Sequence, residues 1–292
     1  SDFHARRTAH PDPDARWDRS NGRIYRVQGT AARSVPPVDV VSLPSRGLVK
    51  LLSHPNGWYA DRARVEMFRR KDKSIVPGLK AMARRRDDRR TALQGLWAVN
   101  ASGGLDRDFA IEMLSHADAW VRLWTVRLLG DRRQVSAPVG SAIGDLARRE
   151  TDPVVLVQLA ATARRLPPDA GLPVVSELMP KKLPVADPRL PLMTWWALEE
   201  HVAEDRQEVL ELFATNSPLW KTPDGLRCGL LLVRRLAAEG TRSGYDSCVT
   251  LLASVPQRSR GEADRRLSWR DFLKDFLYNP GIRRPAGRLP IP

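Results

Sequence analysis

A short turn carrying Asn or Asp, followed each time by an apolar helical stretch, returns at near-regular intervals along most of the chain. These residues are Asn56, Asp88, Asp118, Asp152, Asp187 and Asp224, so subtraction gives intervals of 32, 30, 34, 35 and 37 residues. Asn and Asp are favoured N-caps because their side-chain oxygens accept hydrogen bonds from the free N–H groups of the first helical turn. Repeats of this length with two short helices each predict a stack in which every unit buries its apolar sides against its neighbours.

The clearest copy of the repeat contains Asp118 as its N-cap. Trp120, Trp124 and Leu128 follow at every fourth position, which places them on one side of a helix. Gly130 is expected to end this helix in the left-handed conformation that glycine adopts most easily. The tryptophans are therefore expected to be packing residues of the repeat.

Two further patterns favour the HEAT class of helical repeat. They are the Asp-x-x-Val-Arg motif at 118–122 and the Asp-Pro-Val-Val motif at 152–155. We therefore expect an all-α fold, an armadillo-like α-solenoid of about six to seven HEAT-like helix pairs. The predicted pairs are 46–54 with 57–70, 73–86 with 88–101, 105–116 with 118–130, 136–149 with 152–166, 169–180 with 188–203 and 205–215 with 223–239. A less regular seventh unit is expected from 243 to about 277.

The N-terminal part differs from the rest. Residues 1–45 are expected to be an irregular, extended segment, because five prolines exclude long helices there: Pro11, Pro13, Pro36, Pro37 and Pro44. One short strand is expected at 22–27, followed by a linker at 28–44. The expected division is thus 1–45, a solenoid at 46–280, and a Pro/Arg-rich tail at 281–292.

Composition limits the function classes. The chain has 292 residues, 42% of them hydrophobic, and a net charge of +14, so anionic partners must be considered. No run of about 18 apolar residues predicts a membrane span. Cys228 and Cys248 form neither a metal pattern nor a haem-attachment motif, and they either bridge or stay free. The start at Ser1 without a signal peptide fits a mature product or a fragment.

No constellation for catalysis stands out. His54 and His116 occupy equivalent turn positions, which favours a structural turn residue over a ligand or a base. The sequence contains no phosphate-binding glycine loop, nucleophile elbow or zinc-protease motif. We therefore expect no catalytic, cofactor-binding or metal-binding residues. A metal site in the N-terminal segment is the weaker alternative to solvated side chains; it would involve His4, His10, Asp2, Asp12 and Asp14.

Paired arginines recur along the chain. They lie at 69–70, 84–86, 132–133, 148–149, 164–165 and 234–235. A stripe of this kind is one way to follow a phosphate backbone. However, nearly all pairs fall at predicted helix ends, where cations complement the helix dipole without any ligand. Specific nucleic-acid binding is therefore the second hypothesis.

The tryptophan pair Trp195 and Trp196, with Glu199 one turn on, is the other candidate site. An aromatic side chain beside a carboxylate on helical repeats suits a DNA glycosylase that extrudes a base. Packing is favoured, because adjacent helical residues point about 100° apart and one indole is then buried. As a possible interaction surface we name Trp195, Trp196, Glu199, Arg132, Arg133, Arg164 and Arg165.

Five blocks of sequence occur in order at 17–27, 48–58, 96–105, 116–131 and 190–198. They resemble the middle region of large membrane-bound dehydrogenase-like proteins of planctomycetes and verrucomicrobia. Those proteins combine a β-propeller similar to glucose/sorbosone dehydrogenases, a HEAT-repeat region and often a c-type cytochrome domain. The resemblance implies that the strand at 22–27 is a remnant of a propeller blade.

The resemblance also implies a function without chemistry in this chain. Most of the propeller and the haem-attachment motif have no counterpart here. The chain is then a non-catalytic scaffold or protein-interaction module with no cofactor of its own. Haem c and a propeller-bound cofactor belong to the parent protein, whose propeller and cytochrome domains are the expected partners. The family implies the periplasm or cell surface, for which the sequence itself carries no address.

Overall fold

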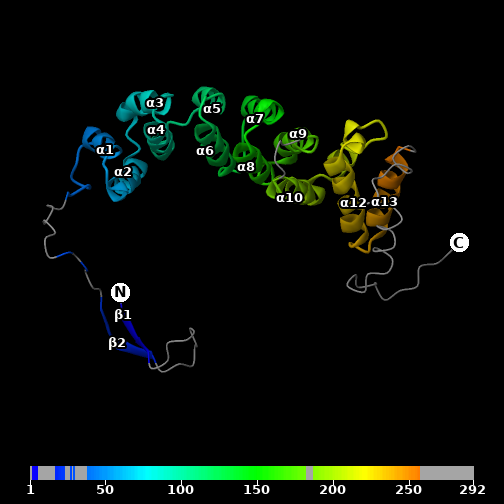
Figure 1. Ribbon diagram of the computed structural model, residues 1–292, viewed down its shortest axis with the longest axis horizontal. Coiled ribbons are helices and arrows are strands. Elements are labelled where there is room, and N and C mark those ends of the chain that lie inside the picture. Colours follow the sequence, from blue (N-terminus) through cyan, green and yellow to red (C-terminus); the bar gives the residue numbers. More distant parts are fainter. Residues whose placement is uncertain are drawn as a thin grey trace. The chain divides into compact units, whose positions relative to one another are not determined.

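The structure is a computed structural model that describes residues 2–5, 17–23, 27, 29, 38–181 and 187–256. The chain divides into two compact units, Ser1–Asp39 and Val40–Pro292 (Figure 1). The expected boundaries at 45 and 280 remain predictions, and the tail at 281–292 lies outside the described ranges.

The first unit contains two short strands, β1 (Asp2–Ala5) and β2 (Trp17–Arg23), which pair antiparallel with Ala5 opposite Trp17. The expected strand at 22–27 is not confirmed. Strand β2 ends at Arg23, and residues 24–26 fall outside the described part. The sequence predicted a later start because the prediction rested on the apolar side chains. The position of β2 depends instead on its pairing with β1.

The second unit is all-α within the described residues. Its helices are α1 (Ser45–Leu51), α2 (Gly57–Arg70), α3 (Val76–Ala83), α4 (Arg89–Ala101), α5 (Arg107–Leu114), α6 (Ala119–Gly130), α7 (Ala137–Arg149), α8 (Pro153–Ala163), α9 (Pro168–Leu178), α10 (Arg189–Glu204), α11 (Arg206–Glu211), α12 (Pro223–Ala237) and α13 (Arg242–Ser254). Short 3-10 turns lie at Lys73–Ile75 and Pro218–Lys221. Each of the six predicted pairs corresponds to two helices, from α1/α2 to α11/α12. Helix α13 begins the expected seventh unit, whose remainder from 257 is not described.

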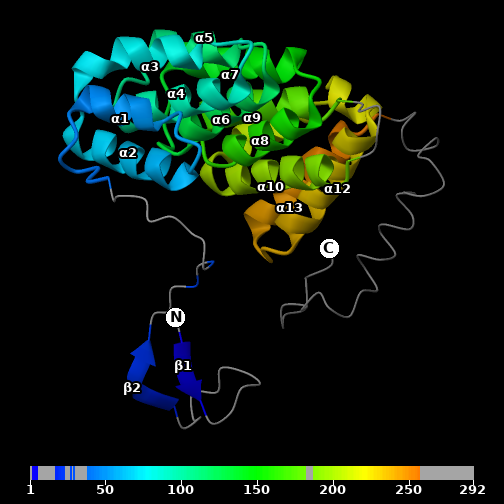
Figure 2. The same cartoon turned by 60° about the vertical axis from the view of Figure 1, so that its left-hand side comes forward.

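The helices of this unit form two layers (Figures 1 and 2). Helices α2, α4, α6, α8, α10 and α12 contact one another in succession, and we call them the even layer. Helices α5, α7 and α9 also contact one another in succession, as part of the odd layer. Partners within a pair, such as α3 and α4, pack together as well. Most helices therefore contact their own partner and the neighbouring pairs.

One continuous apolar core runs through the stack. From α4 to α12, each even helix contributes a leucine or valine with no exposed surface: Leu96, Val126, Leu159, Leu198 and Leu232. Burying a side chain of this size contributes about 1.5–3 kcal/mol. The apolar periodicity seen in the sequence therefore supplies the contacts between units.

The predicted N-caps form at four of the six turns. The side chains of Asn56, Asp88, Asp118 and Asp152 accept hydrogen bonds from backbone N–H groups two or three residues later, at 2.8–3.0 Å. Asp187 likewise accepts from the backbone N–H of Arg189 at 2.8 Å, but it lies one residue before Pro188, which occupies the N-cap position of α10. These turns therefore end one helix and start the next through local hydrogen bonds.

Trp120, expected to be a packing residue, keeps 43% of its surface exposed. Two further local predictions are wrong. Thr222, not Asp224, caps α12, and Asp224 lies within the first helical turn, where burial raises the pKa of its carboxyl group. Gly130 does not adopt the left-handed conformation; Arg133, with φ of 55°, does. A Cβ atom at Gly130 would lie 2.6 Å from Cγ2 of Thr162. Glycine is therefore needed there for close packing of α6 on α8 rather than for a turn.

Candidate functional site

The predicted tryptophan site lies on α10, where the two indoles differ in exposure. Trp195 packs partly buried against the core, whereas Trp196 keeps 40% of its surface exposed. The carboxylate of Glu199 lies 3.7 Å from Nε of Arg235 on α12. Because its charge is already paired, Glu199 is poorly suited to act as a base beside an extruded nucleotide.

The four predicted arginines do not form one cluster of free cations. Arg164 pairs with Glu200 of α10 at 3.0 Å, and Arg165 pairs with Asp131 at 2.7 Å. Arg132 and Arg133 are exposed and have no carboxylate partner among the residues that the structure describes. Only this second pair therefore keeps its charge available to an external anion.

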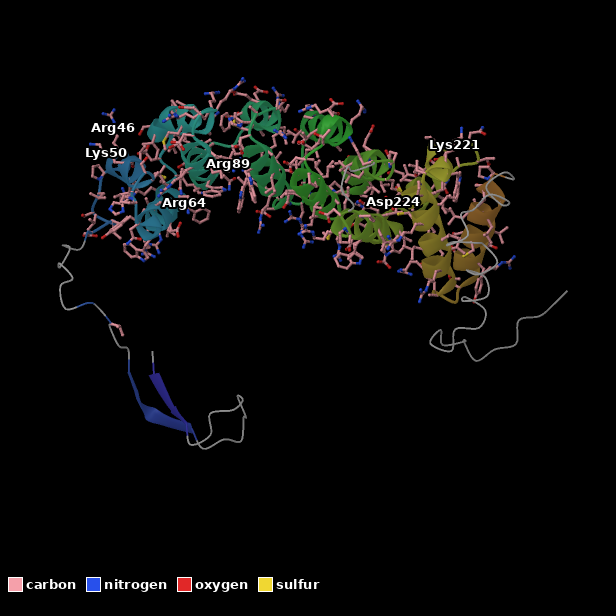
Figure 3. The ribbon with its side chains drawn as sticks, viewed as in Figure 1. Arg46, Lys50, Arg64, Arg89, Lys221 and Asp224 are labelled. Atoms are coloured by element: carbon pink, nitrogen blue, oxygen red, sulfur yellow. The ribbon has the colours of Figure 1, made fainter. Side chains whose placement is uncertain are left out.

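Many cations of the stack bind a carboxylate about one repeat away. The pairs are Arg84–Glu112, Arg89–Asp118, Arg122–Glu150, Arg148–Glu177, Arg164–Glu200 and Arg206–Glu239, with contacts of 2.6–3.0 Å. Figure 3 shows charged side chains along the stack, among them Arg46 and Lys50 of α1, Lys221 of the 3-10 turn Pro218–Lys221 and Asp224 of α12. Exposed pairs of this kind contribute about 0–1 kcal/mol each. They nonetheless remove charge from the arginine stripe that the sequence suggested.

The buried member of this series is Arg122–Glu150, whose side chains keep only 16% and 4% of their surface exposed. Two guanidinium nitrogens bind the two carboxylate oxygens at 2.6 and 2.9 Å. The backbone N–H groups of Thr151 and Asp152 donate to the same carboxylate at 3.0 Å. Burial opposes the ionisation of Glu150, but these hydrogen bonds outweigh it and lower its pKa.

The histidines of the turns serve the backbone. Nδ1 of His54 accepts from the N–H of Asn56, and Nδ1 of His116 accepts from the N–H of Asp118, both at 3.0 Å. This geometry supports the interpretation of both side chains as turn residues. Nε2 of His116 and Nε1 of Trp97 are buried and have no hydrogen-bond partner within the described part of the chain.

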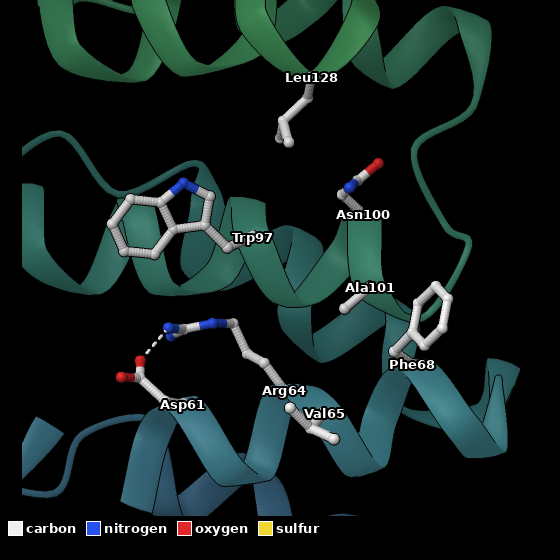
Figure 4. Close-up of a pocket in the computed structure, with 8 residues that line it drawn as sticks. All are labelled: Asp61, Arg64, Val65, Phe68, Trp97, Asn100, Ala101 and Leu128. Carbon is white, nitrogen blue, oxygen red and sulfur yellow. Dashed lines mark hydrogen bonds and ion pairs between the residues drawn. The ribbon is translucent and has the colours of Figure 1, made fainter. Parts of the chain in front are cut away.

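An open groove that the sequence did not predict lies between α2 and α4, with α6 at its far side (Figure 4). Its volume is about 400 Å³. The lining is mainly apolar and includes one amide and one ion pair: Asp61, Arg64, Val65, Phe68, Trp97, Asn100, Ala101 and Leu128. A usable signal was present, because Val65 and Phe68 lie off the apolar side of the helix at 57–70.

The charged residues of the groove are held in place. The guanidinium group of Arg64 is bound by Asp61 and by the side-chain carbonyl of Gln94, and it lies 5.2 Å from the ring centre of Trp97. The indole of Trp97 in turn meets Trp124 edge to face, with ring centres 4.9 Å apart. The groove therefore has rigid aromatic and cationic walls.

A second pocket, of about 380 Å³, lies between α7 and α9 and is lined largely by small residues such as Gly140 and Ala170. Over the described ranges, no three His, Cys, Asp or Glu side chains gather as metal ligands would. No helix among them is long and apolar enough to cross a bilayer. Comparison with known protein families, with curated proteins and with solved structures finds no match for this chain.

Proposed function

We propose that residues 40–256 form a HEAT-like α-solenoid that acts as a non-catalytic scaffold and protein-interaction module. One observation carries this proposal. Within α1–α12, every large hydrophobic side chain that is exposed belongs to the even layer: Trp58, Val65, Phe68, Trp120, Val154, Leu192 and Trp196. Exposed apolar surface gathered on one layer is typical of an interaction surface.

The proposed partners follow from the family resemblance. They are a propeller domain and a c-type cytochrome domain, in the same or a partner chain, which the scaffold would hold in position at the cell surface or in the periplasm. The redox cofactors would then belong to those domains. Reading the genomic sequence in frame on either side of this chain tests the multidomain part directly.

The binding test uses the full chain with its flanking domains, produced separately. We expect binding to protect even-layer helices from hydrogen exchange while leaving α5 and α7 unchanged. Replacing Val154 and Leu192 with Asp should weaken binding, because both side chains are exposed on that layer. Protection confined to the odd layer, or no binding, would contradict the proposal.

Nucleic-acid binding is the competing outcome. It requires an affinity for duplex DNA that falls steeply with salt, because phosphate contacts release counterions. It also requires that replacing Trp195 and Trp196 weakens that binding. The pairing of Arg164, Arg165 and Glu199 within the chain argues against it.

A further inference from the structure

The first three even helices carry an unusual excess of positive charge. Helices α2, α4 and α6 contain eight arginines and two carboxylates, which gives +6 by subtraction. Two of these arginines pair with Asp118 and Glu150 outside the three helices, which leaves +4. Helices α3, α5 and α7 contain four cations and three carboxylates, which gives +1. We call the solvent-facing side of α2, α4 and α6 the α2–α6 surface. Its charge favours an anionic partner.

Two arginines of this surface have neither a carboxylate partner nor a side-chain hydrogen bond among the described residues. Arg62 lies 6.0 Å from the ring centre of Trp58, and Arg127 lies 5.0 Å from that of Trp124. In the sequence they adjoin Asp61 and Leu128, which line the groove. Because neighbouring residues on a helix point about 100° apart, these cations lie on the same two helices as the groove lining but outside the lining itself.

The groove itself is suited to a side chain and a stretch of backbone. Val65, Phe68 and Leu128 supply apolar contact surface, and Phe68 is 60% exposed. The amide of Asn100 also lines the groove, and it makes no hydrogen bond to any described residue. A side-chain amide offers both a donor and an acceptor, which matches the main chain of an extended peptide.

The same geometry disfavours a nucleic acid. Base stacking on an aromatic residue requires a free ring surface. The ring of Trp97 already has Arg64 near one side and meets Trp124 edge to face. The guanidinium groups of Arg62 and Arg127 likewise lie over the indole rings of Trp58 and Trp124. These rings are therefore walls rather than stacking platforms.

We propose that the α2–α6 surface binds an extended acidic peptide segment of a partner protein. One large apolar side chain of the segment occupies the groove, its main chain meets the amide of Asn100, and its carboxylates pair with Arg62 and Arg127. This inference rests on the proposed interaction function and names the surface and the chemistry of its partner.

The experiment selects binders of the immobilised full chain from a library of short random peptides. The enriched peptides are then synthesised and their affinities measured. We expect them to combine Asp or Glu with a large apolar residue. Combining Arg62→Glu with Arg127→Glu should weaken binding at least about tenfold at low salt, because the surface then repels carboxylates.

Matched variants separate the surface from its overall charge. Arg46→Glu with Arg86→Glu makes the same charge change at exposed arginines outside the groove, and it should leave affinity unchanged. Phe68→Ala should weaken binding without unfolding the chain, because Phe68 is largely exposed. Circular dichroism checks that each variant remains folded.

The outcomes separate this inference from the proposed function. Enrichment of basic or neutral peptides, or affinity unaffected by the Arg62/Arg127 variant, would overturn the inference. If the flanking domains still bind the even layer, the scaffold function survives that result. Tighter binding of a short oligothymidylate with the same sensitivity to Arg62 and Arg127 would assign the surface to nucleic acid instead.

Discussion

Replacing Arg122 with Met tests the buried ion pair that joins α6 to the start of α8. The guanidinium group of Arg122 makes two hydrogen bonds to Glu150 and donates to the carbonyl oxygens of His116 and Ala117, both at 2.9 Å. Met fills similar space but supplies none of these donors. The carboxylate of Glu150 then stays buried with only its two backbone N–H partners.

The expected loss of unfolding free energy follows from the burial of the Arg122–Glu150 pair. Removing one member of a buried pair costs about 3–5 kcal/mol, because the other charge loses its partner. The remaining N–H bonds to Glu150 and the 16% exposure of Arg122 place the expected loss near the lower limit, at about 3 kcal/mol. The control Arg164→Met breaks an exposed pair and should cost less than about 1 kcal/mol.

The assay is urea unfolding of the full chain at several pH values, monitored by circular dichroism. The folded-state pKa of Glu150 is lowered, so its stabilising contribution is present above the unfolded-state pKa, near the ordinary value of 4.5, and is lost as pH falls through the folded-state pKa. The difference between the parent chain and Arg122→Met should therefore shrink in acid. A loss no larger than that of Arg164→Met, or one that is independent of pH, would refute the reasoning.

Three further predictions concern packing, capping and thiol chemistry. In thermal melts, Gly171→Ala should destabilise the chain by about 1–3 kcal/mol, since its Cβ would lie 2.4 Å from the imidazole nitrogen Nε2 of His201. The control Gly144→Ala should be neutral or stabilising, because its Cβ would meet nothing within 4 Å. Asp118→Ala should cost about 1–2 kcal/mol through the lost N-cap, against almost no change for the exposed Asp108→Ala; equal urea midpoints would contradict this. Burial raises the pKa of Cys228 to about 12, so a thiol reagent at neutral pH should modify it only after unfolding, and rapid modification of the folded chain would be inconsistent with the structure.

Helix pairing could be read from the sequence because its signals are local. Asp118 and Asp152 lie a few residues from the N–H groups that they cap, so spacing alone locates the helix starts. The same reasoning failed at Asp224, because Thr222 competes for the same cap. It failed at Gly130 because the controlling contact, Thr162, is on another helix.

The sequence by itself therefore determined the all-α class, the succession of helix pairs and the turn role of His54 and His116. Only the tertiary structure decided which arginine meets which carboxylate, and it left Arg62 and Arg127 available while pairing Arg164 and Arg165. It also created the groove, whose lining comes from three helices about one repeat apart. The physical reason is range: capping and periodicity act within a few turns of one helix, whereas side-chain pairing and grooves depend on how neighbouring helices pack.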